Sequence, residues 1–189
     1  MKLDLSSGEL AALLQRALHD HVSAVELHTH PLTQAVELRL AGLRAAASYL
    51  DWMDTDTIGL RMKPSVTAGS PLLHLRLTDL DFHPRSAASP AAGHGDSLSR
   101  LAKRLLRRGA NVAGDSNWVR SRILANLPSR DWLAFDAAGN LLTLDVAKAF
   151  HMHRWTLALR DLRVEIGGIQ LDGDLTPPPA EAPAEPAQA

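Results

Sequence analysis

The chain has 189 residues and a mass of 20.4 kDa; 46% of its residues are hydrophobic and 22% are charged. This composition is typical of a soluble globular protein. The length is enough for one domain with its own core but too short for two. The formal net charge of −1 excludes a global attraction to nucleic acid or acidic lipid, so such a partner would need a local patch. Cysteine is absent, which excludes disulfides, thiolate zinc sites and thiol nucleophiles.

The N-terminal segment predicts a helix over residues 7–19. Ser6 is followed three positions later by Glu9, which is the spacing of a capping box. Apolar residues then recur at helical spacing, at Leu10, Leu13, Leu14, Ala17 and Leu18. The segment lacks the basic stretch and apolar run of a secretory signal, and no stretch approaches the roughly 20 apolar residues of a membrane-spanning helix. We therefore expect a cytoplasmic protein by default.

An alternating apolar pattern with a phase slip of one residue occurs three times and predicts long bulged strands. It covers residues 36–45, 73–82 and, with one substitution, 155–164. Alternation places every second side chain on one face of a strand, so the slip would turn the apolar set away from the core unless a bulge absorbs one residue. Three such strands favour a strongly curved antiparallel sheet with an apolar inner face.

The intervening segments predict further strands, turns and helices. We expect extended chain at 22–30, 58–62 and 169–171, turns at 63–71 and 167–168, a flexible connection at 84–95, helices near 96–109 and 115–128, and a hairpin formed by 132–135 and 141–146. Residues 45–53 fit either a short helix or a continued strand.

We interpret residues 1–175 as a single domain, followed by a disordered tail at 176–189 that is rich in Pro, Ala and Glu. The second and third bulged patterns align at a constant offset, with an Asp-Leu pair at the same place in each. One interpretation is an internal duplication of a helix followed by three strands, with repeats at 1–84 and 96–175. The alternative is that any two short amphipathic strands look alike, because such patterns are degenerate.

Three pairs of histidines are separated by a single residue: His19 and His21, His28 and His30, and His151 and His153. On a strand, side chains at i and i+2 point to the same side about 7 Å apart, so both imidazoles of a pair can reach one metal ion. The alternative is that these histidines face solvent on the polar side of amphipathic strands.

The segment 26–31, Glu-Leu-His-Thr-His-Pro, resembles the first metal-binding motif of amidohydrolases and of the polymerase-and-histidinol-phosphatase family. Residues 81–83, Asp-Phe-His, resemble a late motif of the second family. The resemblance implies a metal-dependent hydrolase in which His28 and His30 bind the metal together with Asp81 or His83. Those families also need a large barrel and further ligands, and the chain has neither the length nor an evident ligand set.

The helix expected near 96–109 carries a basic face. Its cations are Arg100, Lys103, Arg104, Arg107 and Arg108. Such a helix can lie on an anionic membrane surface or meet phosphates, although a core-facing helix with a solvated basic back has the same pattern. Trp118 is the one aromatic residue nearby, so nucleic acid is not an expected partner.

Residues 36–43, 75–82 and 157–171 are similar to the strands of bacterial lipid-binding proteins of the LmeA type, which belong to the tubular lipid-binding (TULIP) superfamily. The likeness is one of strand texture and of the order of helix and strands, and it offers no invariant functional residue to transfer. It implies that a curved sheet and a long helix enclose an acyl chain.

We therefore predict an α+β fold, in which a strongly curved antiparallel sheet of long bulged strands packs against two or three helices. The leading hypothesis for function is non-enzymatic binding of a lipid or another apolar ligand between sheet and helices, with no cofactor. The expected ligand-lining residues are Leu38, Leu40, Leu75, Leu77, Leu157 and Leu159, with the basic helix near anionic head groups. The remaining hypothesis is a structural or interaction domain whose exposed strand edge pairs with a second copy to form a homodimer.

Overall fold

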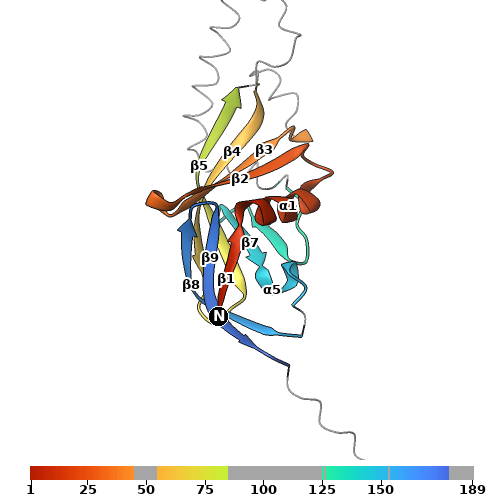
Figure 1. Cartoon of the computed structure of the whole chain (residues 1–189). Coiled ribbons are helices and arrows are strands. Elements are labelled where there is room, and N and C mark those ends of the chain that lie inside the picture. Colours follow the sequence, from red (N-terminus) through yellow and green to blue (C-terminus); the bar gives the residue numbers. More distant parts are fainter. Residues whose placement is uncertain (45–54, 85–124, 126, 153, 179–189) are drawn as a thin grey trace, which may run out of the picture.

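A computed structural model describes residues 1–44, 55–84, 125, 127–152 and 154–178. The described residues form two antiparallel sheets (Figure 1). The small sheet has the strand order β1 (Lys2–Ser6), β9 (Gly168–Thr176) and β8 (Thr156–Glu165). The large sheet has the order β2 (Ala24–His30), β3 (Ala35–Ala41), β4 (Thr55–Val66), β5 (Leu72–Pro84), β7 (Leu141–Asp145) and β6 (Leu133–Asp136). The described helices are α1 (Ser7–Leu18), the short α5 (Val146–Ala149) and the 3-10 turn η1 (Pro31–Thr33).

The predicted antiparallel architecture with few helices is confirmed, but its strands belong to two sheets instead of one. Backbone hydrogen bonds join the sheets at one corner, where Gly69 N donates to Leu159 O at 2.8 Å and Leu159 N donates to Ser70 O at 3.0 Å. The apolar faces of both sheets contribute to one cluster of buried residues, to which α1 adds Leu10, Leu14 and Leu18. None of the helices in the described residues combines the length and apolarity that a bilayer crossing needs.

The predicted N-terminal helix is confirmed as α1, which ends one residue earlier than expected. Its capping box is present, because Glu9 N donates to Ser6 Oγ at 3.2 Å and Ser6 N donates to Glu9 Oε2 at 2.9 Å. The two bonds satisfy backbone donors that the first turn of a helix would otherwise leave without partners. β1, which leads directly into the helix, was not predicted.

Two of the three predicted bulges are confirmed, and they lie at matching positions. In β5 the pairing with β4 skips Thr78, and in β8 the pairing with β9 skips Arg160. In each strand the aspartate after the bulge accepts a hydrogen bond from the next backbone N–H, Leu80 N to Asp79 Oδ1 and Leu162 N to Asp161 Oδ1, both at 2.8 Å. The bulges keep the leucines before and after the slip on the core face, whereas the internal duplication stays a prediction.

The bulge predicted within residues 36–45 is wrong, because β3 ends at Ala41 and pairs with both neighbours without a register shift. Gly42 stands where the other two patterns have aspartate, and its φ of +60° lies in the left-handed region that glycine adopts readily. Glycine also has no side chain to accept the hydrogen bond that supports the other bulges. The chain therefore turns out of the sheet at Gly42, and Leu43 reaches the core from the connection.

The hairpin of β6 and β7 is confirmed, as are the extended segments near 22–30 and 58–62 and the turn at Gly167. The turn predicted for residues 63–71 is shorter than expected, because β4 continues to Val66. β9 likewise runs on to Thr176, beyond the predicted 169–171. The predictions for residues 45–53, 85–95, 96–109 and most of 115–128 and of the tail lie outside the described residues.

Candidate functional site

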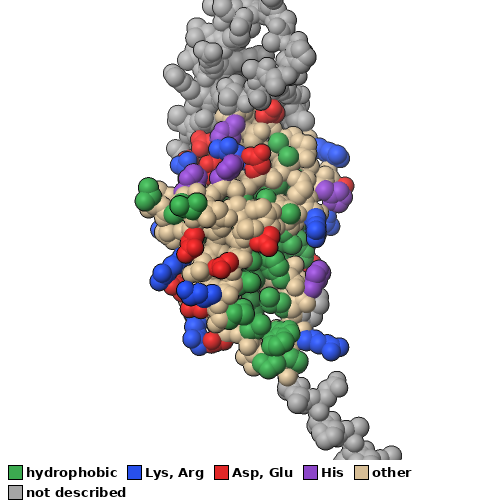
Figure 2. All heavy atoms as spheres, viewed as in Figure 1, with side chains coloured by type: hydrophobic (Ala, Val, Ile, Leu, Met, Phe, Trp, Pro, Cys, Tyr) green, Lys and Arg blue, Asp and Glu red, His purple; other side chains and the backbone are tan. Residues whose placement is uncertain are grey.

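The face of β2–β5 that points away from the core carries most of the chemistry that the described residues offer. Histidine, acidic and basic side chains gather over this part of the molecule (Figure 2). The antiparallel register places them in rows across the strands, so that Glu37 on β3 stands between His28 on β2 and Arg61 on β4. Strand alternation therefore gives one sheet an apolar face and a face rich in titratable groups.

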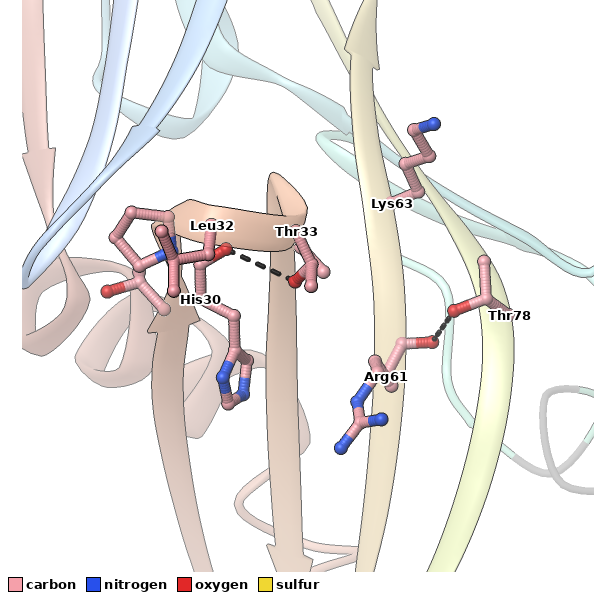
Figure 3. A pocket seen from close by; sticks show the side chains of 9 residues that line it. His30, Leu32, Thr33, Arg61, Lys63 and Thr78 are labelled. Atoms are coloured by element: carbon pink, nitrogen blue, oxygen red, sulfur yellow. Dashed lines mark hydrogen bonds between the residues drawn. The ribbon is translucent and has the colours of Figure 1, made fainter.

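A pocket of about 570 Å³, which we call the η1 pocket, opens beside the turn between β2 and β3 (Figure 3). It is lined by Thr29, His30, Pro31, Leu32, Thr33, Ala35, Arg61, Lys63 and Thr78. Thr78 is the bulged residue of β5, and its Oγ1 donates to Arg61 O at 3.0 Å. The pocket thus combines two cations and three hydroxyl groups with an apolar wall, and among the described residues none that lines it is acidic.

The charge of Arg61, which lines this pocket, is only weakly neutralised by its neighbour Asp79. Its Nη1 lies 3.8 Å from Asp79 Oδ2, and both side chains are more than a third exposed. An ion pair of this length at the surface contributes little and is screened by water and salt. A small anionic group in the η1 pocket would therefore meet Arg61 and Lys63 as partners that are only weakly neutralised.

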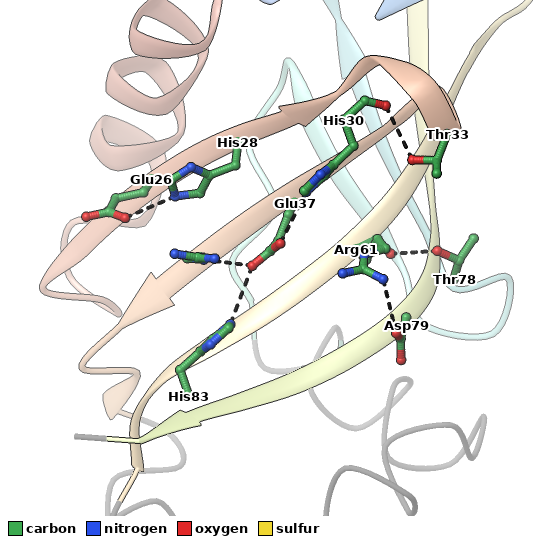
Figure 4. Close-up of polar contacts among 10 residues, drawn as sticks. Glu26, His28, His30, Thr33, Glu37, Arg61, Thr78, Asp79 and His83 are labelled. Carbon is green, nitrogen blue, oxygen red and sulfur yellow. Dashed lines mark hydrogen bonds and ion pairs between the residues drawn. The ribbon is translucent and has the colours of Figure 1, made fainter. Parts of the chain in front are cut away.

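Glu37 is the centre of a second feature on this face, where Figure 4 shows it between His30 and His83. Together with Arg39 these residues form what we call the Glu37 network. The side chain of Glu37 is only 6% exposed. Arg39 Nε donates to Oε1 at 2.7 Å, His30 Nε2 lies 3.3 Å from Oε2, and His83 Nε2 lies 3.4 Å from Oε1. A buried carboxylate needs such partners, because an unpaired one would lose its hydration without compensation.

The surroundings of Glu37 set its charge state. Burial alone would raise the pKa of this carboxyl, but the hydrogen bonds from Arg39 and His30 and the charges of Arg39 and His83 lower the pKa below its ordinary value. Glu37 is therefore ionised near neutral pH. An ionised carboxylate orients the imidazoles beside it, as in other carboxylate–histidine pairs.

Gly59 on β4 makes the approach of His83 to Glu37 possible. A Cβ on Gly59 would lie 2.6 Å from His83 Nε2 and 3.3 Å from Glu37 Oε1. Glycine weakens a strand interior, and at this position it leaves space for a side chain from a neighbouring strand to lie across the sheet. This is the structural reason for a glycine in the middle of β4.

Of the three histidine pairs noted in the sequence, His28 and His30 are divided between two carboxylates. His28 Nε2 lies 3.3 Å from Glu26 Oε2, whereas His30 belongs to the Glu37 network. Among the described residues no group of three or more His, Asp or Glu side chains is arranged to hold a metal ion. The structure does bring His83 close to His30, but through Glu37, which the sequence interpretation missed.

A second pocket of about 470 Å³, the α1 groove, runs along α1, between the helix and the segments 130–132 and 149–151. Its apolar lining is Ala12, Leu13, Ala17, Trp132, Ala149 and Phe150, and its polar lining is Glu9, Arg16, Arg130 and His151. Arg130 holds the two walls together, because its Nη2 donates to Ala17 O at 3.1 Å. Hydrophobic side chains are visible at the surface below α1, over the part of this face where β7 and α5 lie (Figure 2).

The six leucines expected to line a ligand are all buried, with exposed fractions between 0% and 4%. They belong to the one core cluster, so the structure brings the three patterns together as expected. Neither the η1 pocket nor the α1 groove is lined by any of them. The expected basic cluster at residues 100–108 lies outside the described residues.

Comparisons of the chain with protein-family models, curated proteins and solved structures found no match. The likeness to the tubular lipid-binding superfamily therefore stays a prediction.

Proposed function

We propose that this chain is a non-enzymatic binder of a lipid or another apolar ligand, and that the α1 groove takes an amphiphile with an anionic head. The observation that carries the proposal is the composition of the groove, which sets the apolar side chains of Leu13, Trp132 and Phe150 against the cations Arg16 and Arg130. An apolar floor gives affinity, and a few polar groups fix the orientation of the ligand.

The groove has the groups that such a ligand needs. Leu13, Trp132 and Phe150 are half-buried and pack on the core, so each still has apolar surface that a ligand can cover. Covering an acyl chain is worth about 0.8 kcal/mol per buried methylene, less the cost of ordering the chain. Arg130 uses two of its five N–H donors on Ala17 O, which leaves others for a carboxylate or phosphate.

The proposal includes the finer features of the predicted architecture. We take the large sheet to be strongly curved, which the bulge in β5 favours, and the whole to be an α+β domain in which the sheet packs against α1 and one or two further helices. In this arrangement the six leucines belong to the buried core on which Leu13, Trp132 and Phe150 of the groove pack.

Isothermal titration with lysophosphatidylglycerol, kept below its micelle-forming concentration, tests the proposal. We expect saturable binding of one molecule per chain, weaker by about fivefold for lysophosphatidylcholine because its head group is neutral overall. Ala12→Phe, which fills the groove from an exposed position on α1, should weaken binding at least about tenfold. Arg16→Glu should abolish the preference for the anionic head.

Two matched controls separate the groove from general surface effects. Ala138→Phe adds the same ring in the exposed turn between β6 and β7, and Arg163→Glu reverses a charge on β8 whose side chain is 73% exposed. Neither residue lines the groove, so both variants should bind like the wild type. The proposal fails if the wild type shows no saturable binding, or if Ala12→Phe and Ala138→Phe bind equally well.

A further inference from the structure

Two turns of the structure expose large apolar side chains almost completely. Leu32 in η1 has a relative exposure of 102%, and Ile166 in the turn between β8 and β9 has one of 95%. The other large hydrophobic side chains described as exposed, Met1 and Trp155, are about half exposed at 46% and 45%. Neither side chain buries apolar surface within the described part of the chain, so both are free to contact a partner.

The two turns are fixed to each other, although more than 130 residues separate them in the chain. Gln34 Nε2 donates to Val164 O at 3.1 Å, and Val164 N donates to Gln34 Oε1 at 3.0 Å. Gly167 N donates to Thr29 Oγ1 at 3.0 Å. Leu32 and Ile166 therefore project from one rigid unit, which we call the apolar tip. Hydrophobic side chains project from the edge of the molecule near the turn between β2 and β3 (Figures 1 and 2).

Cations lie beside the apolar tip. Leu32 is part of the wall of the η1 pocket, whose other lining residues include Arg61 and Lys63. Glu165 next to Ile166 is acidic and exposed, so the positive charge is concentrated on the Leu32 side of the tip. The surface thus places protruding apolar groups next to a cationic, hydroxyl-lined pocket.

We infer that the apolar tip and the η1 pocket together form a docking surface for a lipid bilayer with anionic head groups. Leu32 and Ile166 enter the interfacial region, while Arg61 and Lys63 meet lipid phosphates in the η1 pocket. Two single side chains on protruding turns are too small for a stable protein interface, which buries roughly 800 Å² on each partner. A bilayer interface accepts such side chains individually and attracts nearby Lys and Arg.

This docking surface uses different residues from the α1 groove, and it does not require the groove to hold a ligand. Co-sedimentation of the full chain with vesicles at low salt tests it. We expect binding to vesicles of phosphatidylcholine with about one third phosphatidylglycerol, and much weaker binding to phosphatidylcholine alone. The double variant Leu32→Ser and Ile166→Ser should lower the vesicle partition coefficient by about tenfold or more. Lys63→Gln should lower the partition coefficient for vesicles that contain phosphatidylglycerol by about fivefold, and it should leave binding to phosphatidylcholine alone unchanged.

The controls carry the same changes at the far ends of the strands of the small sheet. Trp155→Ser removes a half-exposed apolar side chain at the other end of β8 from Ile166, and Lys2→Gln removes a cation near the start of β1. Both should bind vesicles like the wild type. The inference is overturned if the wild type does not sediment with the anionic vesicles, if the double variant sediments as well as Trp155→Ser, or if the double variant instead changes the oligomeric state measured by analytical ultracentrifugation.

Discussion

Replacing Glu37 with glutamine should lower the free energy of unfolding at pH 7 by about 1–2 kcal/mol. Hydrogen bonds to a charged group contribute roughly 1.5–3 kcal/mol, and breaking a fully buried ion pair costs about 3–5 kcal/mol. The lower range applies here, because Arg39 is 36% exposed and His30 39% exposed, so water can solvate them once the carboxylate is gone. The amide oxygen of glutamine can also still accept the hydrogen bond from Arg39.

The same substitution should change how stability depends on pH. The pKa of Glu37 is lower in the folded protein than the ordinary value of 4.5. A carboxyl group of this kind stabilises the folded state above its unfolded pKa, and the contribution is lost as the pH falls through the folded pKa. The wild type should therefore lose stability more steeply than Glu37→Gln below about pH 4.5, and the difference between the two proteins should shrink.

Urea denaturation followed by circular dichroism, at pH 7 and in steps down to pH 3, measures both effects. Glu26→Gln is the matched control, because it makes the same change on the same face, where Glu26 is 66% exposed and lies 3.3 Å from His28. The control should stay within about 0.5 kcal/mol of the wild type, as expected for a surface pair. Equal stabilities for the two variants, or a difference that does not change with pH, would refute the assignment of Glu37 as a buried, ionised centre.

Three further substitutions probe the core, the helix cap and the space beneath His83. Leu40→Ala removes a side chain that is 0% exposed and should cost about 2–5 kcal/mol, measured by urea denaturation; a cost below 1 kcal/mol would contradict its place in the core. Ser6→Ala removes the helix cap and should cost about 1 kcal/mol, visible as a lower melting temperature. Gly59→Ala should push His83 away from Glu37, since the new Cβ would lie 2.6 Å from Nε2; unchanged histidine NMR resonances would argue against this contact.

The elements that the sequence predicted well are those whose signal is local. The capping box of α1 and the bulges at Thr78 and Arg160 each depend on residues within a few positions of one another. The first phase slip was misinterpreted because its apolar pattern matches the other two. Whether the strand continues through a bulge or ends depends on the residue at the slip, which is aspartate in the other two patterns and Gly42 in this one. One backbone conformation therefore decided between a bulge and the end of a strand.

The candidate sites were harder to predict, because distant segments assemble them. Glu37 alternates with leucines and so has the pattern of a solvent-facing residue; its burial comes from His30 and His83 on other strands. The α1 groove joins Ala17 to Arg130, which are 113 residues apart. No periodicity or short motif in the sequence indicates which of these distant segments lie side by side. The histidine pair at 28 and 30 is a local motif that is easy to recognise, but the two side chains contact different carboxylates.

Native mass spectrometry of the gently purified chain, with added lysophosphatidylglycerol, is the most direct test of lipid binding. We expect a peak for one bound amphiphile per chain, which is retained in Ala138→Phe and lost in Ala12→Phe. A spectrum that contains only the free protein mass at every lipid concentration below micelle formation would contradict lipid binding in the α1 groove.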